Sequence, residues 1–248
     1  MPIRQYRALP DGITHALFDA DQTLYPRSSG FETHLIMDRI KELVHKTMEA
    51  EKGAPVPFED ALALANQYYA EYGSSYLGLE ADFGIPLEES LDFIYHDGGL
   101  DYSALSPCER TRAGLEVMRF ERCIRLAILS NGTDVHVHQV LSAMSLTGLF
   151  GVVHGFNHNG YKPKPDPSTI ENTLWDMNAQ AERTIFIEDN LSNLRAARSL
   201  KIGFNVYIGE ALESAPDNDD NAFDLWATTL PEALDALNQA LAEKQEAA

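Results

Sequence analysis

Apolar residues along the chain form two patterns, which are short continuous runs and longer stretches with helical spacing. The first short run, residues 13–19, lies close to the N-terminus and is typical of a buried strand. From Ser106 onward, short apolar runs alternate with stretches of helical spacing. This repeated order predicts an α/β fold, in which a parallel sheet is covered by helices on both faces.

The same alternation divides the C-terminal region into elements. Strands are expected at residues 124–129, 151–156, 184–187 and 202–208. Helices are expected at residues 109–119, 134–144, 168–177, 191–200 and from 230 onward. The last helix has clear start signals, because Thr229 can cap it, Pro231 lies in its first turn and Glu232 can complete a capping box. Two segments are expected to be irregular, the lead-in 1–12 and the acidic surface loop 217–221.

Residues 28–103 show helical spacing without the short apolar runs of strands. Apolar residues recur every three or four positions from Phe31 to Val44, and the turn-forming segment 53–57 separates this helix from the next. We therefore expect an all-helical domain at residues 28–103. It is inserted into an α/β core that is formed by residues 1–27 and 104–248.

Composition adds little to this picture beyond class and compartment. The 248 residues are 44% hydrophobic and 23% charged, which is ordinary for a globular protein. No apolar stretch is long enough to cross a bilayer and no secretion signal is seen, so we expect a cytoplasmic protein without a membrane partner. Cys108 and Cys123 lack disulfide or zinc spacing and are expected to be buried or half-buried thiols.

Charge restricts the partners more strongly. The formal net charge is -19, with a sequence pI near 4.7, and no Lys/Arg cluster interrupts it. Such a chain repels a polyanion, so a nucleic acid polymer is not expected as a partner. A small phosphorylated ligand would have to be held by a bound cation and a few local donors, because the overall field opposes it.

Polar side chains follow several predicted strands at the point where each strand ends. They are Asp19 and Asp21, then Ser130 and Asn131, then the loop lysines Lys162 and Lys164, and finally Glu188 and Asp189. Because the carboxyl ends of parallel strands meet at one edge of a sheet, we expect these groups to lie close together.

The clustered carboxylates point to a bound cation. Asp19, Asp21 and Asp189 would repel one another unless a hard cation lay among them, and with water molecules they suit Mg²⁺. Glu188 is either a further ligand or a neighbour of the ligands. The cation and a lysine would then neutralise a phosphoryl group, while a hydroxyl and backbone N–H groups orient it.

The two aspartates of the first cluster can divide the chemistry of phosphoryl transfer. Asp19, fixed at the end of a strand, can attack phosphorus and form an aspartyl-phosphate. Asp21, in the following turn, can protonate the leaving alkoxide and later deprotonate water. Ser130, Asn131 and Gly132 precede a helix, so they are expected both to cap it and to bind phosphate oxygens.

These motifs resemble those of the haloacid dehalogenase superfamily of phosphatases. The first motif of that family is matched by Asp19-Ala20-Asp21-Gln22-Thr23-Leu24 and the second by Ser130. The third is matched by Lys164-Pro165-Asp166-Pro167, and the fourth by Glu188-Asp189 with Asn193. It covers nearly the whole chain and implies a Rossmann-like core, a helical cap inserted after the first motif, and an aspartyl-phosphate mechanism that depends on Mg²⁺. It also favours Lys164 over Lys162 as the phosphate-binding lysine.

Residues 18–26, 68–79 and 160–167 are similar, more narrowly, to the pyrimidine 5'-nucleotidase branch. This likeness implies a pyrimidine nucleoside monophosphate as substrate, with Tyr25 and Tyr76 in contact with it. The tyrosines of residues 68–76 also have helical spacing, so most of them are expected in the core of the helical domain.

Apart from His15 in the first predicted strand, the histidines are scattered along the chain. They are His34, His45, His96, His136, His138, His154 and His158. Their positions match no metal-binding spacing. His136 and His138 lie on nearly opposite faces of their predicted helix, so neither is given a catalytic role.

Three other functions remain open at this point. The same fold supports a haloacid dehalogenase, but displacement at a carbon–halogen bond needs no protonated alkoxide, so Asp21 would lack a task. A phosphomutase acting on a sugar phosphate would use the same cluster. A catalytically silent binding protein is the third alternative. The substrate and the oligomeric state cannot be derived from the sequence.

Overall fold

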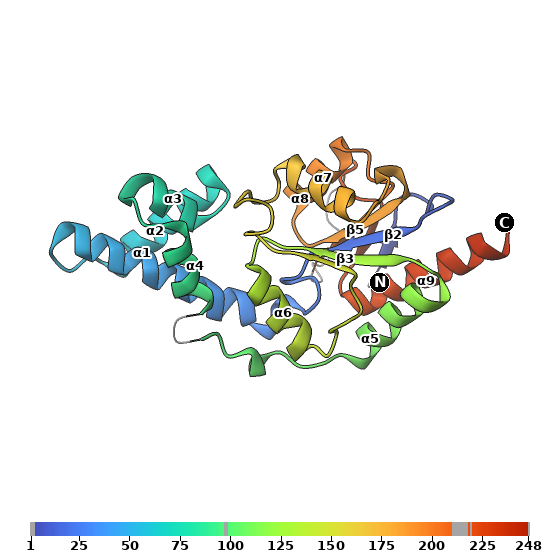
Figure 1. The fold of residues 1–248 in the computed structure, drawn as a ribbon, viewed down its shortest axis with the longest axis horizontal. Helices are drawn as coiled ribbons and strands as arrows, with labels where there is room; N and C mark the ends of the chain where they lie inside the picture. The colour runs from blue at the N-terminus through green and yellow to red at the C-terminus, as the bar shows by residue number, and fades with distance from the viewer. Residues whose placement is uncertain (1–2, 97–98, 210–217, 219, 248) are drawn as a thin grey trace. The chain divides into compact units, whose positions relative to one another are not determined.

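The computed structural model describes residues 3–96, 99–209, 218 and 220–247 (Figure 1). The chain divides into two compact units. Residues 1–28 and 105–248 form the core unit, and Ser29–Ala104 form the helical unit. Within the described residues, every helix is too short or too polar to cross a membrane.

The core unit is built on one seven-stranded sheet. Its strands lie in the order β1-β7-β6-β5-β2-β3-β4, and all neighbours are parallel except β1 and β7. The strands are β1 (Ile3–Gln5), β2 (His15–Phe18), β3 (Arg125–Leu129), β4 (Val152–His154), β5 (Thr184–Glu188), β6 (Phe204–Ile208) and β7 (Leu225–Ala227). The central strands β2 and β5 are buried along their whole length, as expected of strands covered on both faces.

Helices cover both faces of this sheet, and Figure 1 shows α7 and α8 on one side with α5, α6 and α9 on the other. Their bounds are α5 (Glu109–Glu116), α6 (Asp134–Ala143), α7 (Pro167–Asp176), α8 (Leu191–Ser199) and α9 (Leu230–Glu246). Alternate strand residues point to opposite faces, so Leu17 and Phe186 pack against Ile170 of α7 and Leu194 of α8. The predicted α/β class with a mostly parallel sheet is confirmed.

The helical unit contains four main helices. They are α1 (Met37–Lys52), α2 (Phe58–Tyr72), α3 (Ser75–Phe83) and α4 (Leu87–Tyr95), preceded by a π-helical turn at Phe31–Ile36. Helices α2 and α3 approach closely at Gly78, where a Cβ atom would lie 2.1 Å from the ring of Tyr68. The buried Ser75 hydroxyl also donates to the Ala65 carbonyl, at 2.9 Å. Close packing of small residues therefore joins these two helices.

Several local expectations were wrong. The segment 1–12, expected to be irregular, contains β1, which pairs with β7, a strand that was also not expected. Strands of three residues are too short to show an alternation of apolar and polar positions. In β1, Arg4 and Gln5 are also polar and exposed. Cys123 is exposed, whereas Cys108 is half-buried, and both are free.

The acidic segment 217–221 agrees with the expected surface loop where it is described. Asp220 is exposed and pairs with Arg195, and residues 217 and 219 lie outside the described chain.

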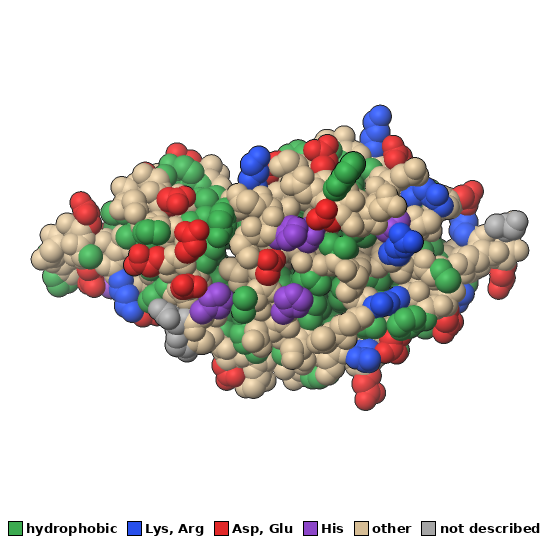
Figure 2. Space-filling model, viewed as in Figure 1, with side chains coloured by type: hydrophobic (Ala, Val, Ile, Leu, Met, Phe, Trp, Pro, Cys, Tyr) green, Lys and Arg blue, Asp and Glu red, His purple; other side chains and the backbone are tan. Residues whose placement is uncertain are grey.

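Acidic side chains are spread over the face drawn in Figure 2, and Lys and Arg side chains stand mostly singly between them. This distribution agrees with the formal net charge of -19.

Candidate active site

The carboxyl ends of three neighbouring strands bring the predicted residues together. Register places Phe18 of β2 beside Ile128 of β3 and Ile187 of β5. The next residues along these strands therefore lie at the same edge of the sheet. Asp19 is fixed there by its own N–H, which donates to the Ile187 carbonyl at 2.9 Å.

Lys164 links two carboxylates at this edge. Its Nζ donates to Oδ1 of Asp19 at 2.6 Å and to Oε2 of Glu188 at 2.7 Å, and all three side chains are buried. Burial lowers the pKa of Lys164, but the charges of Asp19 and Glu188 outweigh burial and raise it above its usual range. The ammonium group therefore stays charged and offsets the two carboxylates.

In Asp19, the surroundings disfavour the ionised form of the carboxyl group. Burial and then the charge of Glu188 raise the pKa of Asp19 well above its usual range, and Lys164 offsets this only in part. Asp19, Glu188 and Asp189 each offer a carboxylate oxygen, and these oxygens lie within 4.8 Å of one another. An oxygen-only set suits Mg²⁺, and a divalent cation would relieve the repulsion between Asp19 and Glu188, so the residues present fit this ion.

Asp21 has different surroundings, although it is only two residues from Asp19. Its Oδ1 lies 2.9 Å from Nε2 of His136 and accepts a hydrogen bond of 2.5 Å from the Tyr25 hydroxyl. Burial raises the pKa of Asp21, but His136 and Tyr25 outweigh burial and hold it below its usual range. The two aspartates are therefore close in the chain but electrostatically distinct.

The second segment of the site, residues 130–132, arranges the loop that carries Lys164. The Asn131 side chain accepts the Lys164 N–H at 2.8 Å and donates to the Lys164 carbonyl at 3.1 Å. Ser130 Oγ accepts the Gly132 N–H at 2.9 Å. The expectation that residues 130–132 cap the following helix was wrong, because Thr133 is the N-cap of α6 and accepts the His136 N–H.

A match to a known family decides the affiliation of the chain. The sequence model described as "Haloacid dehalogenase-like hydrolase" matches residues 16–206, which include every part of this cluster. The chain belongs to this family.

Proteins similar to this hydrolase are named for several different activities. Haloacetate dehalogenase H-2 of Moraxella sp. (strain B) is 27% identical over 193 residues, which are 77% of each protein. A HAD phosphatase from Thermococcus onnurineus superposes with a TM-score of 0.62 at 21% identity, covering 91% of this chain and 98% of that one. A putative beta-phosphoglucomutase from Thermotoga maritima gives 0.61 at 19% identity, covering 92% and 99%. At these identities the structural likeness shows the fold.

Other predicted residues of the hydrolase have different surroundings. Lys162 is exposed, whereas Lys164 is buried in the cluster. Oε1 of Glu188 accepts the N–H groups of Asp189 and Asn190, at 3.2 and 3.1 Å, so Glu188 also shapes the turn after β5. Asn193 is buried in the first turn of α8. Tyr76 is 4% exposed within the helical unit, and its contact with substrate stays a prediction.

His136 is the functional candidate that sequence reasoning missed in this hydrolase. Its side chain is fully buried and contacts Asp21, whereas the sequence analysis assigned it no catalytic role. A Cβ atom on Gly132 would lie 2.5 Å from His136 Cδ2, so the glycine leaves room for the ring. A glycine four residues before a histidine, at the start of a helix that follows a strand, was the available signal.

Proposed function

We propose that this hydrolase is a phosphomonoester hydrolase that depends on Mg²⁺ and forms an aspartyl-phosphate on Asp19. The observation that supports the proposal best is the contrast between the surroundings of Asp19 and Asp21. Asp19 lies with Lys164, Glu188 and Asp189, whereas Asp21 is held by a histidine and a tyrosine. Two carboxylates with separate environments can serve as nucleophile and as acid/base.

The first step uses Asp19 as nucleophile. Asp19, Glu188 and Asp189 would hold the Mg²⁺ ion, which when bound supplies positive charge for the phosphoryl oxygens and favours the ionised form of Asp19. The Asp19 oxygen attacks phosphorus while the bond from phosphorus to the leaving oxygen breaks. Lys164 and the Ser130 hydroxyl, which accepts the Gly132 N–H and keeps its own hydrogen to donate, would orient the phosphoryl group.

Asp21 moves the proton in both steps. In the first step it donates its proton to the leaving alkoxide and becomes a carboxylate, which His136, 2.9 Å away, stabilises. The lowered pKa of Asp21 favours this release. In the second step the carboxylate takes a proton from the water that attacks the aspartyl-phosphate, which restores the protonated form of Asp21. Tyr25 holds the Asp21 carboxylate in place through its 2.5 Å hydrogen bond.

We propose a pyrimidine nucleoside monophosphate as the substrate, with Tyr25 among its contacts. The proposal rests on the resemblance of residues 18–26, 68–79 and 160–167 to that branch. A panel of about a hundred phosphorylated metabolites with Mg²⁺, including UMP, CMP, sugar phosphates and pyridoxal phosphate, tests it. Turnover of sugar phosphates without turnover of UMP or CMP would exclude the nucleotide assignment, and isomerised sugar phosphate without released phosphate would indicate a mutase.

The covalent step has its own test. Wild-type protein that is mixed with substrate and quenched in acid should gain the mass of one phosphoryl group on the peptide containing Asp19. The Asp19→Asn variant should gain none and should not release phosphate. Phosphate release by that variant at the wild-type rate would rule out the mechanism.

A haloacid dehalogenase is the second candidate, because the curated relative at 27% identity is a haloacetate dehalogenase. This reaction gives no task to the Asp21 contacts and needs no cation among the carboxylates. Halide release from a haloacetate in the presence of EDTA, without phosphatase activity in the presence of Mg²⁺, would establish it instead.

A further inference from the structure

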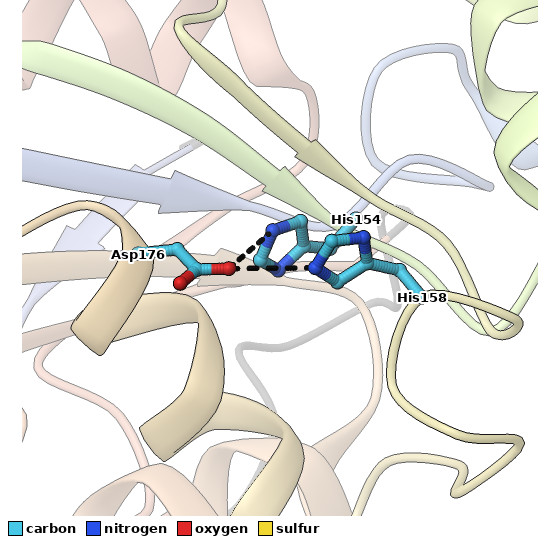
Figure 3. Close-up of side chains that lie close together, drawn as sticks. All are labelled: His154, His158 and Asp176. Atoms are coloured by element: carbon cyan, nitrogen blue, oxygen red, sulfur yellow. Dashed lines mark hydrogen bonds and ion pairs between the residues drawn. The ribbon is translucent and has the colours of Figure 1, made fainter.

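Three side chains of the core unit converge outside the candidate active site. His154 ends β4, His158 lies in the loop that follows, and Asp176 is the last residue of α7 (Figure 3). Nε2 of His154 lies 3.2 Å from Oδ2 of Asp176, and Nε2 of His158 lies 3.4 Å from the same oxygen. The sequence spacing of the histidines indicated no such group, because Asp176 joins it from a separate helix.

We propose that His154, His158 and Asp176 bind a divalent transition-metal ion, with Zn²⁺ as the best-fitting ion. Zinc takes imidazole nitrogen and carboxylate oxygen at about 2.0–2.2 Å in a tetrahedral arrangement, which separates neighbouring ligand atoms by about 3.3–3.5 Å. The observed separations of 3.2 and 3.4 Å from Asp176 Oδ2 to the two nitrogens agree with two edges of such a tetrahedron.

The hydrogen bonds of His154 leave the correct nitrogen available. The Thr173 hydroxyl donates its one hydrogen to the Thr169 carbonyl, at 2.9 Å, so it can only accept from the ring of His154. Nδ1 of His154, 3.1 Å from Thr173 Oγ1, therefore carries the hydrogen in the neutral ring. Its Nε2 then carries no hydrogen and lies 3.2 Å from Oδ2 of Asp176, and a cation bound to both atoms would replace the repulsion between them with two bonds.

The two rings lie close enough to share one ion after a small adjustment. The imidazoles of His154 and His158 stack, with centroids 3.6 Å apart and planes 16° apart. Two protonated rings at this separation would repel each other. Because each nitrogen lone pair lies in the plane of its ring, binding of one ion by both rings requires the exposed His158 ring to tilt out of the stack. His154 is buried, while the side chains of His158 and Asp176 are 44% and 46% exposed, so solvent can supply the fourth ligand.

A bound ion would cross-link three elements of the core unit, because its ligands come from the end of β4, the following loop and the end of α7. It would therefore stabilise the folded core, by an amount that rises with the logarithm of the zinc concentration relative to the dissociation constant. This inference does not depend on the proposed function, because the three residues lie outside the phosphoryl-transfer cluster.

Zinc titration of the untagged full chain tests the proposal, with His158→Gln as the disruptive variant and His138→Gln as its matched control. His138 is an exposed histidine of α6 outside the cluster. Asp189→Asn is added to all three proteins to weaken zinc binding by the carboxylates. Calorimetry should give one site per chain in the parent and in the control, and more than about tenfold weaker binding in the His158 variant.

Two further readouts keep the test decisive. Zinc should raise the melting temperature of the parent and the control but not of the His158→Gln protein. Co²⁺ in place of zinc should give the intense visible absorption of a four-coordinate ion, lost in the same variant. Equal zinc affinity and equal cobalt spectra in the His158 and His138 variants would overturn the proposal and leave a hydrogen-bonded surface cluster.

Discussion

Two clusters of titratable side chains lie in the core unit, and they differ in the atoms they offer and in how their charge is balanced. The cluster of Asp19, Glu188 and Asp189 offers only oxygen, and it is mostly buried and holds an internal lysine. The cluster of His154, His158 and Asp176 offers two nitrogens and one oxygen, is partly exposed, and has a threonine that orients one ring. This difference in ligand chemistry is why we propose a hard cation for the first cluster and zinc for the second.

The two clusters also differ in whether a positively charged side chain balances their carboxylates. Lys164 offsets part of the negative charge of the first cluster. The second cluster contains no lysine or arginine within the hydrogen bonds and ion pairs that join its three residues. A change in one cluster should leave ion binding at the other intact. Of the four substitutions below, Asp19→Asn and Thr173→Val test this separation, and the other two test the first cluster.

The largest effect is expected for Asp19→Asn. Loss of the nucleophile should lower kcat for phosphate release by at least about a thousandfold, since no other group in the cluster can form the covalent intermediate. Steady-state assays with Mg²⁺ measure this loss. Zinc affinity of the histidine cluster should not change, and a parallel fall in zinc affinity would contradict the separation of the two clusters.

Lys164→Met should reduce stability strongly. It leaves the buried carboxylates of Asp19 and Glu188 without their shared cation, which costs about 3–5 kcal/mol when a buried pair is broken. Urea unfolding in EDTA measures the free energy of unfolding. Adding Glu188→Gln should recover part of the loss, and a double variant as unstable as the sum of both single changes would refute the pairing.

His136→Gln should lower kcat by about tenfold to a hundredfold with little change in KM, because it removes the partner that stabilises the carboxylate form of Asp21. Stopped and continuous phosphate assays measure both constants. His138→Gln, a change on the exposed surface of the same helix, is the control and should keep full activity. A larger effect on KM than on kcat would assign His136 to substrate binding instead.

The smallest effect is expected for Thr173→Val. Removing the hydroxyl that accepts the hydrogen of His154 Nδ1 should weaken zinc binding by about tenfold, as is usual when the partner of a metal-binding histidine is lost. Calorimetric titration measures the affinity. Phosphatase activity should stay at the wild-type level, and unchanged zinc affinity would show that Thr173 does not orient the ring.

Sequence reasoning predicted the residues that depend on simple geometry. Asp19, Ser130 and Glu188 follow apolar runs, and parallel strands bring such positions to one edge, so their proximity followed from the pattern. His136 and Asp176 could not be placed in this way, because their contacts depend on the rotation of α6 and α7 about their own axes. Strand β1 was missed because Arg4 and Gln5 are polar, and β7 because Asp224 interrupts the short apolar run around it, whereas the equally short β4 lies within the predicted strand 151–156.

The position of the helical unit in the chain has a consequence for folding. His15 of β2 pairs with Arg125 of β3 and Thr184 of β5, so the central sheet requires contacts over more than a hundred residues. Contacts within Ser29–Ala104 are more local, as between Tyr68 and Asp82. Because local contacts close smaller loops, the helical unit is expected to fold before the sheet that surrounds its insertion point is complete. The strand that leads to Asp19 is therefore synthesised before both of its neighbours in the sheet and pairs with them only after the helical unit has been made.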